Sequence, residues 1–161
     1  MSFFPKLTLG EVIGSGGFGK VYKAKWNGLN AAVKILNPIE NAPKDEVYKL
    51  AKNEANLHIR LRYRHIILFY DIITYNDTLA IITEYAEMGS LSSVLEKPSV
   101  PLPWKTRWRL SIEIISGLSY LHNNGIIHRD LKCDNVLLTT HMEVKLCDFG
   151  LAKTKKNISG I

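Results

Sequence analysis

The chain has 161 residues, of which 46% are apolar and 22% are charged. These values match ordinary globular usage and exclude collagen-like, low-complexity and disordered chains. The 21 basic and 15 acidic residues give a net charge of +6. A positive balance of this size favours acidic or phosphate-bearing partners without indicating nucleic acid.

The cysteine content and the N-terminus both favour a cytoplasmic protein. Cys133 and Cys147 form no framework of regular spacings, which favours free thiols in a reducing compartment. The first six residues lack the features of a signal peptide. No apolar run approaches the roughly 18 residues that a membrane-spanning helix needs. We therefore expect no membrane span.

The first half of the chain is predicted to form strands and one helix. Strands are expected at 7–13, 20–26 and 31–36, the second because it alternates with period two. A helix is expected from Asp45 to about Leu61, where apolar residues recur every three or four positions. Two further β-branched runs, 66–74 and 79–84, are expected to pair as a hairpin.

The composition changes at 86–89, which we interpret as a hinge between two lobes. Beyond it, a long helical pattern runs from Trp104 through Trp108, Ile112 and Ile115 to about Leu121, and Asn123-Asn124-Gly125 ends it. The remainder, 126–161, alternates short apolar runs with charged or glycine-bearing loops. Catalytic residues concentrate in segments of this kind.

A glycine string between the first two strands follows the pattern GxGxxG, with Gly14, Gly16 and Gly19 at the fixed positions. A dinucleotide-binding string would open a helix, but the residues after Gly19 have strand periodicity. The string therefore joins two antiparallel strands. Glycine lets backbone N–H groups approach phosphate oxygens, although glycine clusters mark plain turns more often than phosphate sites.

Lys34 lies in an otherwise apolar strand, where an unpaired ammonium group would be costly to bury. One interpretation is that its head simply reaches water. The other is an ion pair with Glu54 on the inner stripe of the following helix, which would aim the ammonium group at phosphates.

Four motifs occur once each and in order: GxGxxGxV, the strand Ala31-Ala32-Val33-Lys34, the stretch His128-Arg129-Asp130-Leu131 with Asn135, and Asp148-Phe149-Gly150. Together with the intervening Glu54, they make the chain resemble a eukaryotic protein kinase from about Leu7 to Ile161. Details around Thr83 and Lys132 resemble the serine/threonine kinases of the tyrosine-kinase-like group, near mixed-lineage and Raf-like kinases.

The resemblance implies that Asp130 orients the substrate hydroxyl and accepts its proton, while Lys132 steadies the transferring phosphoryl group. It further implies that Lys34, held by Glu54, contacts the phosphates of ATP. The remaining implied contacts are two Mg²⁺ ligands, Asn135 and Asp148, and the ATP-site residues Ile13, Gly14, Ser15, Gly16, Gly17, Phe18, Gly19, Lys20, Val21, Ala32, Thr83, Glu84, Ala86 and Leu137. Thr83 would guard the rear of the base pocket, and the backbones of Glu84 and Ala86 would bind adenine.

The implied fold is the bilobal α+β kinase arrangement. A five-stranded antiparallel N-lobe with one helix would span 7–85, the hinge 86–89, and an incomplete helical C-lobe 90–161, with ATP bound between the lobes. The chain ends within what should be the activation segment, so we expect a fragment of a longer kinase. Without the other C-lobe helices, apolar faces of the helix at 104–124 would remain exposed.

Two function classes follow. The first is a signalling serine/threonine kinase that transfers the γ-phosphoryl group of Mg·ATP to protein hydroxyls and is itself a substrate of an upstream kinase at Thr154 or Ser159. The alternative is a non-catalytic nucleotide-binding or kinase-interacting module. Nucleic-acid binding is a distant third, because the basic residues are scattered.

His58, four residues after Glu54, is a further departure from the family pattern. We hypothesise that its neutral imidazole packs near Phe149 and that protonation favours an inactive position of the helix. A partly exposed histidine with no switching role is the competing interpretation. Cys147, directly before Asp148, is either open to covalent ligands or a buried inert thiol.

Overall fold

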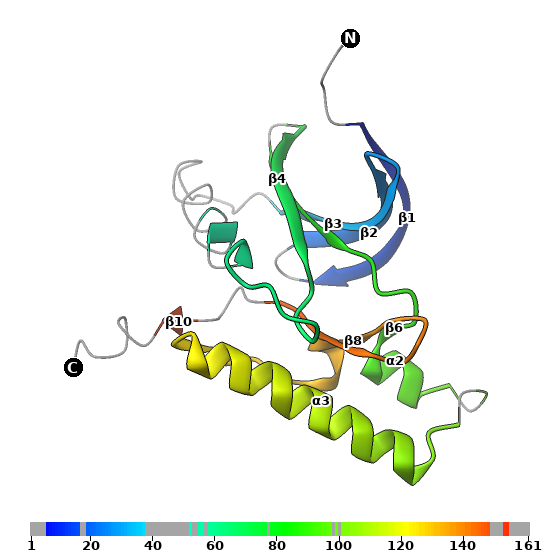
Figure 1. Ribbon diagram of the computed structural model, residues 1–161. Coiled ribbons are helices and arrows are strands. Elements are labelled where there is room, and N and C mark those ends of the chain that lie inside the picture. Colours follow the sequence, from blue (N-terminus) through cyan, green and yellow to red (C-terminus); the bar gives the residue numbers. More distant parts are fainter. Residues whose placement is uncertain are drawn as a thin grey trace. The chain divides into compact units, whose positions relative to one another are not determined.

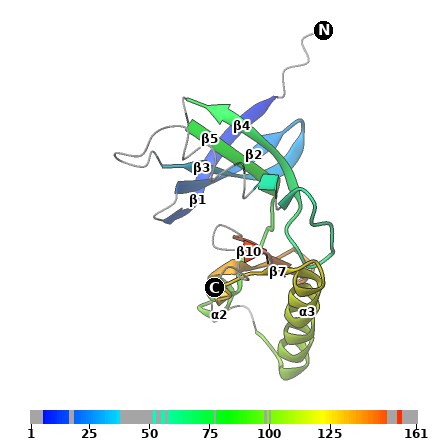
Figure 2. The same ribbon diagram turned by 90° about the vertical axis from the view of Figure 1, so that its left-hand side faces the viewer.

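The computed structural model describes residues 6–16, 19–37, 52, 55–56, 58–76, 78–97, 99, 101–148 and, for the backbone only, 153–154. The chain forms two compact units (Figures 1 and 2). The first unit comprises residues 1–59 and 68–85, and the second comprises 60–67 and 86–161.

The first unit contains one five-stranded antiparallel sheet in the order β1-β2-β3-β5-β4 (Figure 1). Its strands are β1 (Leu7–Gly16), β2 (Gly19–Trp26), β3 (Leu29–Leu36), β4 (Phe69–Tyr75) and β5 (Thr78–Glu84). The predicted five-stranded antiparallel sheet is thereby confirmed.

The turn between β2 and β3 follows directly from the sequence. Asn27 and Gly28 both have positive φ, 49° and 87°, as a two-residue type I′ hairpin turn requires. Asn27 is tied down by its Oδ1, which accepts a hydrogen bond from the Lys6 N–H at 3.0 Å. This turn fixes the register in which Trp26 pairs with Leu29.

The two faces of this sheet carry different residues. Directly opposed residues in neighbouring strands share a face. One face buries the core residues Ala24, Trp26, Ala31, Val33, Ala80 and Ile82. The opposite face carries a smaller cluster in which Ala55, Phe69 and Ile81 pack together.

The second unit has two short sheets and two helices. Its elements are β6 (Gly89–Ser90), α2 (Leu91–Leu95), α3 (Trp104–Asn123), β7 (Ile126–Ile127), the 3₁₀ turn η1 (Cys133–Asn135), β8 (Val136–Leu138), β9 (Val144–Leu146) and β10 (Lys153–Thr154). The sheets are β6-β8-β9 and β10-β7. Sequence periodicity did not predict α2, β6 or η1, because each is too short to show a repeat.

Helix α3 packs its Leu110, Gly117 and Leu121 face into the second unit. A Cβ at Gly117 would lie 2.8 Å from Leu146 Cδ1 and 3.2 Å from the His65 carbonyl oxygen. Glycine therefore allows the helix to approach β9 closely. Of the apolar residues in the predicted helical pattern, Leu121 is buried, whereas Trp104, Trp108, Ile112 and Ile115 are exposed.

The strand predicted at 66–74 begins only at Phe69. The residues before it pair with β9 instead: the Leu146 N–H donates to the His65 carbonyl at 2.8 Å, and the Ile67 N–H donates to the Leu146 carbonyl at 2.9 Å. Residues 60–67 consequently pack with the second unit, although the sequence analysis placed them in the first lobe.

The helix predicted from Asp45 to about Leu61 lies mostly outside the described residues. Lys52, Ala55, Asn56 and His58 are helical, and the chain turns at Ile59 and Arg60. The helix therefore ends before Leu61. Among the described residues, no helix combines the length and apolarity that a bilayer crossing needs.

Candidate functional site

The glycine string forms the tip of the β1–β2 hairpin, as predicted. Gly14 pairs with Val21, Ser15 with Lys20, and Gly16 with Gly19, after two register shifts in β1. Gly17 and Phe18 lie outside the described residues. Because a strand and not a helix follows, the dinucleotide-binding interpretation is excluded.

Gly19 is the glycine with the strictest steric requirement. Its φ is +151°, and a Cβ there would lie 2.2 Å from the Ile35 carbonyl oxygen on β3. No side chain fits that position without moving the β3 backbone. Gly16, by contrast, has open space around its Cβ position.

Four of the predicted ATP-site residues share one face of the first sheet. Val21 on β2 lies opposite Lys34 on β3, and Ala32 lies opposite Thr83 on β5. Lys34 and Ala32 are two residues apart and therefore point to the same side. Lys34 is half-buried, and Ile13 and Lys20 are exposed at the hairpin end. Glu54 lies outside the described residues, so its ion pair with Lys34 stays a prediction.

Glu84 makes two bonds to Leu68. Its N–H donates to the Leu68 carbonyl at 2.8 Å, and its Oε1 accepts from the Leu68 N–H at 2.7 Å. Burial raises the pKa of the neighbouring Tyr70 above its ordinary value, and the negative charge of Glu84 adds to that effect. Since its N–H is already committed, only the Glu84 carbonyl stays a candidate for the predicted adenine contact.

The segment after Glu84 is tied to the second unit's small sheet. The Gly89 N–H donates to the Ala86 carbonyl at 3.1 Å, and the Met88 N–H donates to the Leu138 carbonyl at 3.1 Å. Burial pushes the pKa of Glu87 upward, but hydrogen bonds from the backbones of Glu87 and Thr140 outweigh it, so the pKa lies below its ordinary value. Leu137, on β8, is half-buried between Ser90 and Lys145.

His128 organises the loop that carries Asp130. The imidazole is 2% exposed; its Nδ1 accepts the Asp130 N–H at 3.3 Å, and its Nε2 lies 2.9 Å from the Cys147 carbonyl. A carbonyl only accepts hydrogen bonds, so the proton sits on Nε2. Arg129, between them, has φ of 68° and is exposed. The loop thus turns sharply around a buried ring.

Asp130, Lys132 and Asn135 form one polar cluster. Lys132 Nζ lies 3.2 Å from Asp130 Oδ2. The buried Asn135 donates through Nδ2 to the Asp130 backbone carbonyl at 2.8 Å and to Asp130 Oδ2 at 3.0 Å. These two neighbours orient the Asp130 carboxylate. Its side chain is 30% exposed, so the carboxylate is still open to solvent.

The two predicted magnesium ligands lie in the same unit. Asn135 commits its Nδ2 to Asp130, which leaves its Oδ1 as the oxygen for a cation. The Cys147 N–H donates to the Asn135 carbonyl at 3.0 Å, so Asp148 follows directly on a residue bonded to Asn135. Asp148 has φ of 62° and is half-buried. One carboxylate and one amide oxygen suit Mg²⁺, which takes few protein ligands and keeps several waters.

In the described part of the chain, no three His, Cys, Asp or Glu side chains are grouped to hold a metal. A dedicated all-protein metal cage is therefore not present there.

Of the predicted phosphosites, Thr154 lies on β10 and Ser159 lies outside the described residues. Cys147 is half-buried, so it is neither fully open to covalent ligands nor a fully buried thiol.

Phe149, the predicted packing partner of His58, also lies outside the described residues. His58 is 4% exposed, so the interpretation as a partly exposed histidine is wrong. Its ring centroid lies 5.8 Å from that of Phe69, at an interplanar angle of 49°. The switch hypothesis stays a prediction.

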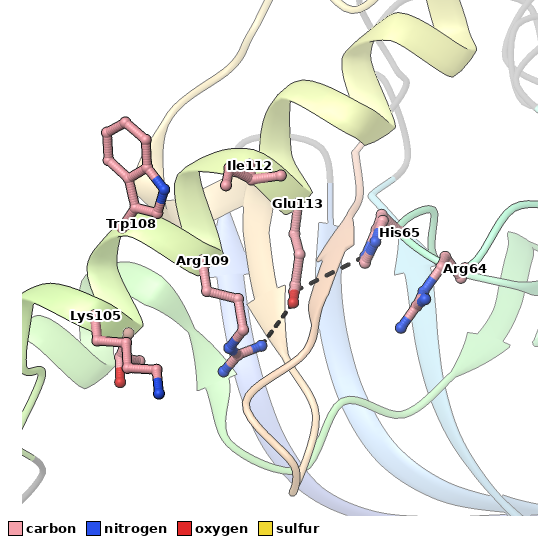
Figure 3. Close-up of a pocket in the computed structure, with 8 residues that line it drawn as sticks. Arg64, His65, Lys105, Trp108, Arg109, Ile112 and Glu113 are labelled. Atoms are coloured by element: carbon pink, nitrogen blue, oxygen red, sulfur yellow. Dashed lines mark hydrogen bonds and ion pairs between the residues drawn. The ribbon is translucent and has the colours of Figure 1, made fainter.

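No sequence motif indicated a buried polar cluster in which Glu113 of α3 faces His65 (Figure 3). Arg109 and Arg64 line the same shallow pocket. The signal that could have found it is a lone acid at 113 within the apolar run from Ile112 to Ile115. A single acid on a helix is usually a solvated surface residue, so the pattern alone was not informative.

Comparison with known proteins identifies the family. The protein kinase domain model matches residues 7–159. The chain is 40% identical over 153 residues to the serine/threonine-protein kinase CTR1 of Arabidopsis thaliana, which covers 92% of this chain and 18% of that protein. It is 38% identical over 152 residues to a probable serine/threonine-protein kinase of Dictyostelium discoideum, covering 94% of this chain and 16% of that protein.

The chain belongs to the protein kinase domain family, and its relatives are serine/threonine kinases. The chain spans only 16% and 18% of the length of these two curated relatives. Members of this family generally use ATP and Mg²⁺.

Proposed function

We propose that this chain carries the ATP-binding and catalytic residues of a protein serine/threonine kinase. The observation that carries the proposal is the cluster of Asp130, Lys132 and Asn135, in which a carboxylate is oriented by an amide and faces an ammonium group. The homologues at 36–40% identity support the same class. The finer proposal is a signalling kinase of the tyrosine-kinase-like group, near mixed-lineage and Raf-like kinases, acting in the cytoplasm.

Phosphoryl transfer requires positioning and neutralisation of charge more than covalent chemistry. In this chain Asp130 would receive the proton of a serine or threonine hydroxyl, with its backbone N–H fixed by His128. Lys132, beside it, would offset the charge on the transferring phosphoryl group. Bound Mg²⁺ would neutralise the phosphates, held by Asn135 and Asp148.

The first unit would supply the ATP contacts. Backbone N–H groups of the hairpin tip would approach phosphate oxygens, and Lys34 would contact the α- and β-phosphates with Glu54 as its partner. Val21, Ala32 and Thr83 share the Lys34 face of the sheet and offer apolar and hydroxyl contacts suited to a nucleoside.

Replacing Asp130 with asparagine tests the proposal. We expect Asp130→Asn to lower phosphate transfer to a generic serine/threonine acceptor protein by about 10²–10⁴-fold, the usual contribution of a general base. Asp134→Asn is the matched control, because Asp134 is an exposed acid in the same loop. The measurement is transfer of labelled γ-phosphate from Mg·ATP.

Equal activity of Asp130→Asn and the wild type would contradict the proposal. Binding of Mg·ATP by the wild type without any transfer would instead favour the non-catalytic regulatory module. Strongly salt-dependent binding of RNA or DNA would favour a nucleic-acid binder.

A further inference from the structure

Strand β9 leads directly to Asp148, and successive backbone groups along it are held from several sides. The Leu146 N–H and carbonyl bond to the His65–Ile67 segment at 2.8 and 2.9 Å. The Cys147 N–H donates to the Asn135 carbonyl at 3.0 Å, and its own carbonyl faces His128 Nε2 at 2.9 Å. The position of Asp148 is therefore set by where β9 is anchored.

The first residue of β9 is anchored by two side chains. The Val144 N–H donates to Glu113 Oε2 at 2.9 Å, and the Val144 carbonyl lies 3.2 Å from His65 Nδ1. His65 therefore carries its proton on Nδ1. His65 Nδ1 also lies 3.9 Å from Glu113 Oε2 (Figure 3). The Val144 peptide groups are therefore held by one side chain from α3 and one from the 60–67 segment.

The other oxygen of Glu113 is fixed within its own helix. Glu113 Oε1 accepts from Arg109 Nη1 at 2.6 Å across one helical turn (Figure 3). The Glu113 side chain is 12% exposed and that of His65 is 6% exposed. A buried carboxylate is tolerated only when hydrogen bonds satisfy it, and this one accepts from a charged donor at Oε1 and from a backbone donor at Oε2.

We propose that Glu113 and His65 are positioning residues that set β9, and through it Asp148, for binding the magnesium ion of Mg·ATP. The inference rests on the proposed function. Neither residue would touch nucleotide. Groups that hydrogen-bond a metal ligand directly change metal affinity by about 10–100-fold when they are replaced. Glu113 and His65 act through the β9 backbone, so we expect an effect at the lower end of that range.

Pairing with β8 and with residues 65–67 already holds β9 in the sheet. Glu113 also accepts a hydrogen bond from the N–H of Val144, a fully buried residue. Removing the Glu113 carboxylate removes this hydrogen bond. An unsatisfied buried N–H favours displacement of the strand end toward water. On this proposal, a displacement at Val144 reaches Asp148 through the three residues between them.

Glu113→Ala and Glu113→Gln test the role. Glutamine keeps an acceptor for the Val144 N–H, whereas alanine removes it. We expect Glu113→Ala to raise by about tenfold the Mg²⁺ concentration at which a fluorescent ATP analogue is half-bound, and to speed amide exchange at Val144. Glu113→Gln is expected to retain most of both properties.

Glu143→Gln is the matched control. Glu143 lies next to Val144 and pairs with Arg64 at 3.3 Å, but both side chains of that pair are exposed. Its replacement is expected to leave the Mg²⁺ requirement and the exchange at Val144 unchanged. Circular dichroism confirms that each variant is folded, and Glu113→Gln keeps the comparison available if Glu113→Ala does not fold.

An unaltered Mg²⁺ requirement in Glu113→Ala would overturn the positioning role, as would unaltered amide exchange at Val144. A wild-type protein that binds no Mg·nucleotide would instead overturn the proposed function. Amide exchange at Val144 then still decides whether Glu113 holds β9.

Discussion

Single side chains in this molecule set the direction of backbone segments that carry chemistry. The buried ring of His128 accepts one backbone bond and donates another, so it joins the Asp130 loop to Cys147. Asn135 holds the same loop by donating through Nδ2 to the Asp130 backbone carbonyl and to Asp130 Oδ2. Such bonds are individually modest, near 1 kcal/mol net, but leaving a buried partner unsatisfied costs more.

The backbone around Gly19 leaves no room for a side chain. We expect Gly19→Ala to destabilise the first unit by about 2–4 kcal/mol, because a Cβ would clash with the Ile35 carbonyl and the backbone conformation suits glycine. Gly16→Ala, which meets open space, is the control and should change stability little. Urea unfolding followed by circular dichroism measures both. Similar midpoints for the two variants would refute the steric argument.

The raised pKa of Tyr70 leads us to predict that the stability of the folded protein falls at alkaline pH. Its pKa is raised in the folded state by burial and by Glu84, so folding favours the neutral phenol. That contribution is complete below the unfolded pKa of about 10 and is lost as pH rises through the higher folded-state pKa. We expect Tyr70→Phe to lose less stability than the wild type above pH of about 10. Parallel stability curves for the two proteins would contradict this.

At the scale of elements, α3 has two distinct faces. Leu110, Gly117 and Leu121 are buried, whereas Trp104 and Trp108 are 82% and 72% exposed. Ile112 and Ile115 extend the exposed apolar stripe along the helix. Contiguous apolar surface of this kind promotes association of protein molecules.

We therefore predict that Trp104→Glu combined with Trp108→Glu lowers binding of a hydrophobic dye and lowers self-association of the chain. The control is Ser111→Glu combined with Ser119→Glu, which makes the same change of charge at exposed polar positions of α3. Dye fluorescence and light scattering measure the effect. Equal reductions in the two double variants would attribute it to charge, and the prediction for the apolar stripe would be wrong.

At the scale of the whole molecule, the two units differ in how far their structure follows from local sequence. In the first unit, period-two alternation and β-branched runs predicted the strands, and Asn27-Gly28 accounts for the turn that joins β2 to β3. The second unit depends on contacts between distant segments. Residues 65–67 pair with β9, which lies about 80 residues later in the chain.

The candidate site was partly predictable for the same reason. The resemblance to protein kinases implied Asp130, Lys132, Asn135 and Asp148, and the structure brings the first three together. Spacing did not indicate that the Glu84 N–H is committed to Leu68. Glu113 and His65 were missed because neither belongs to a motif and their proximity depends on how α3 packs.

The sequence by itself determined the resemblance to a family, which implied the residues proposed for chemistry, and the strands of the first unit, because these depend on motif identity and on local periodicity. Only the tertiary structure decided which residues support them. The bonds from Glu113 and His65 to Val144 join residues 31 and 79 positions apart. Bonds over such separations form only when packing brings the segments together, and no pattern along the chain records them.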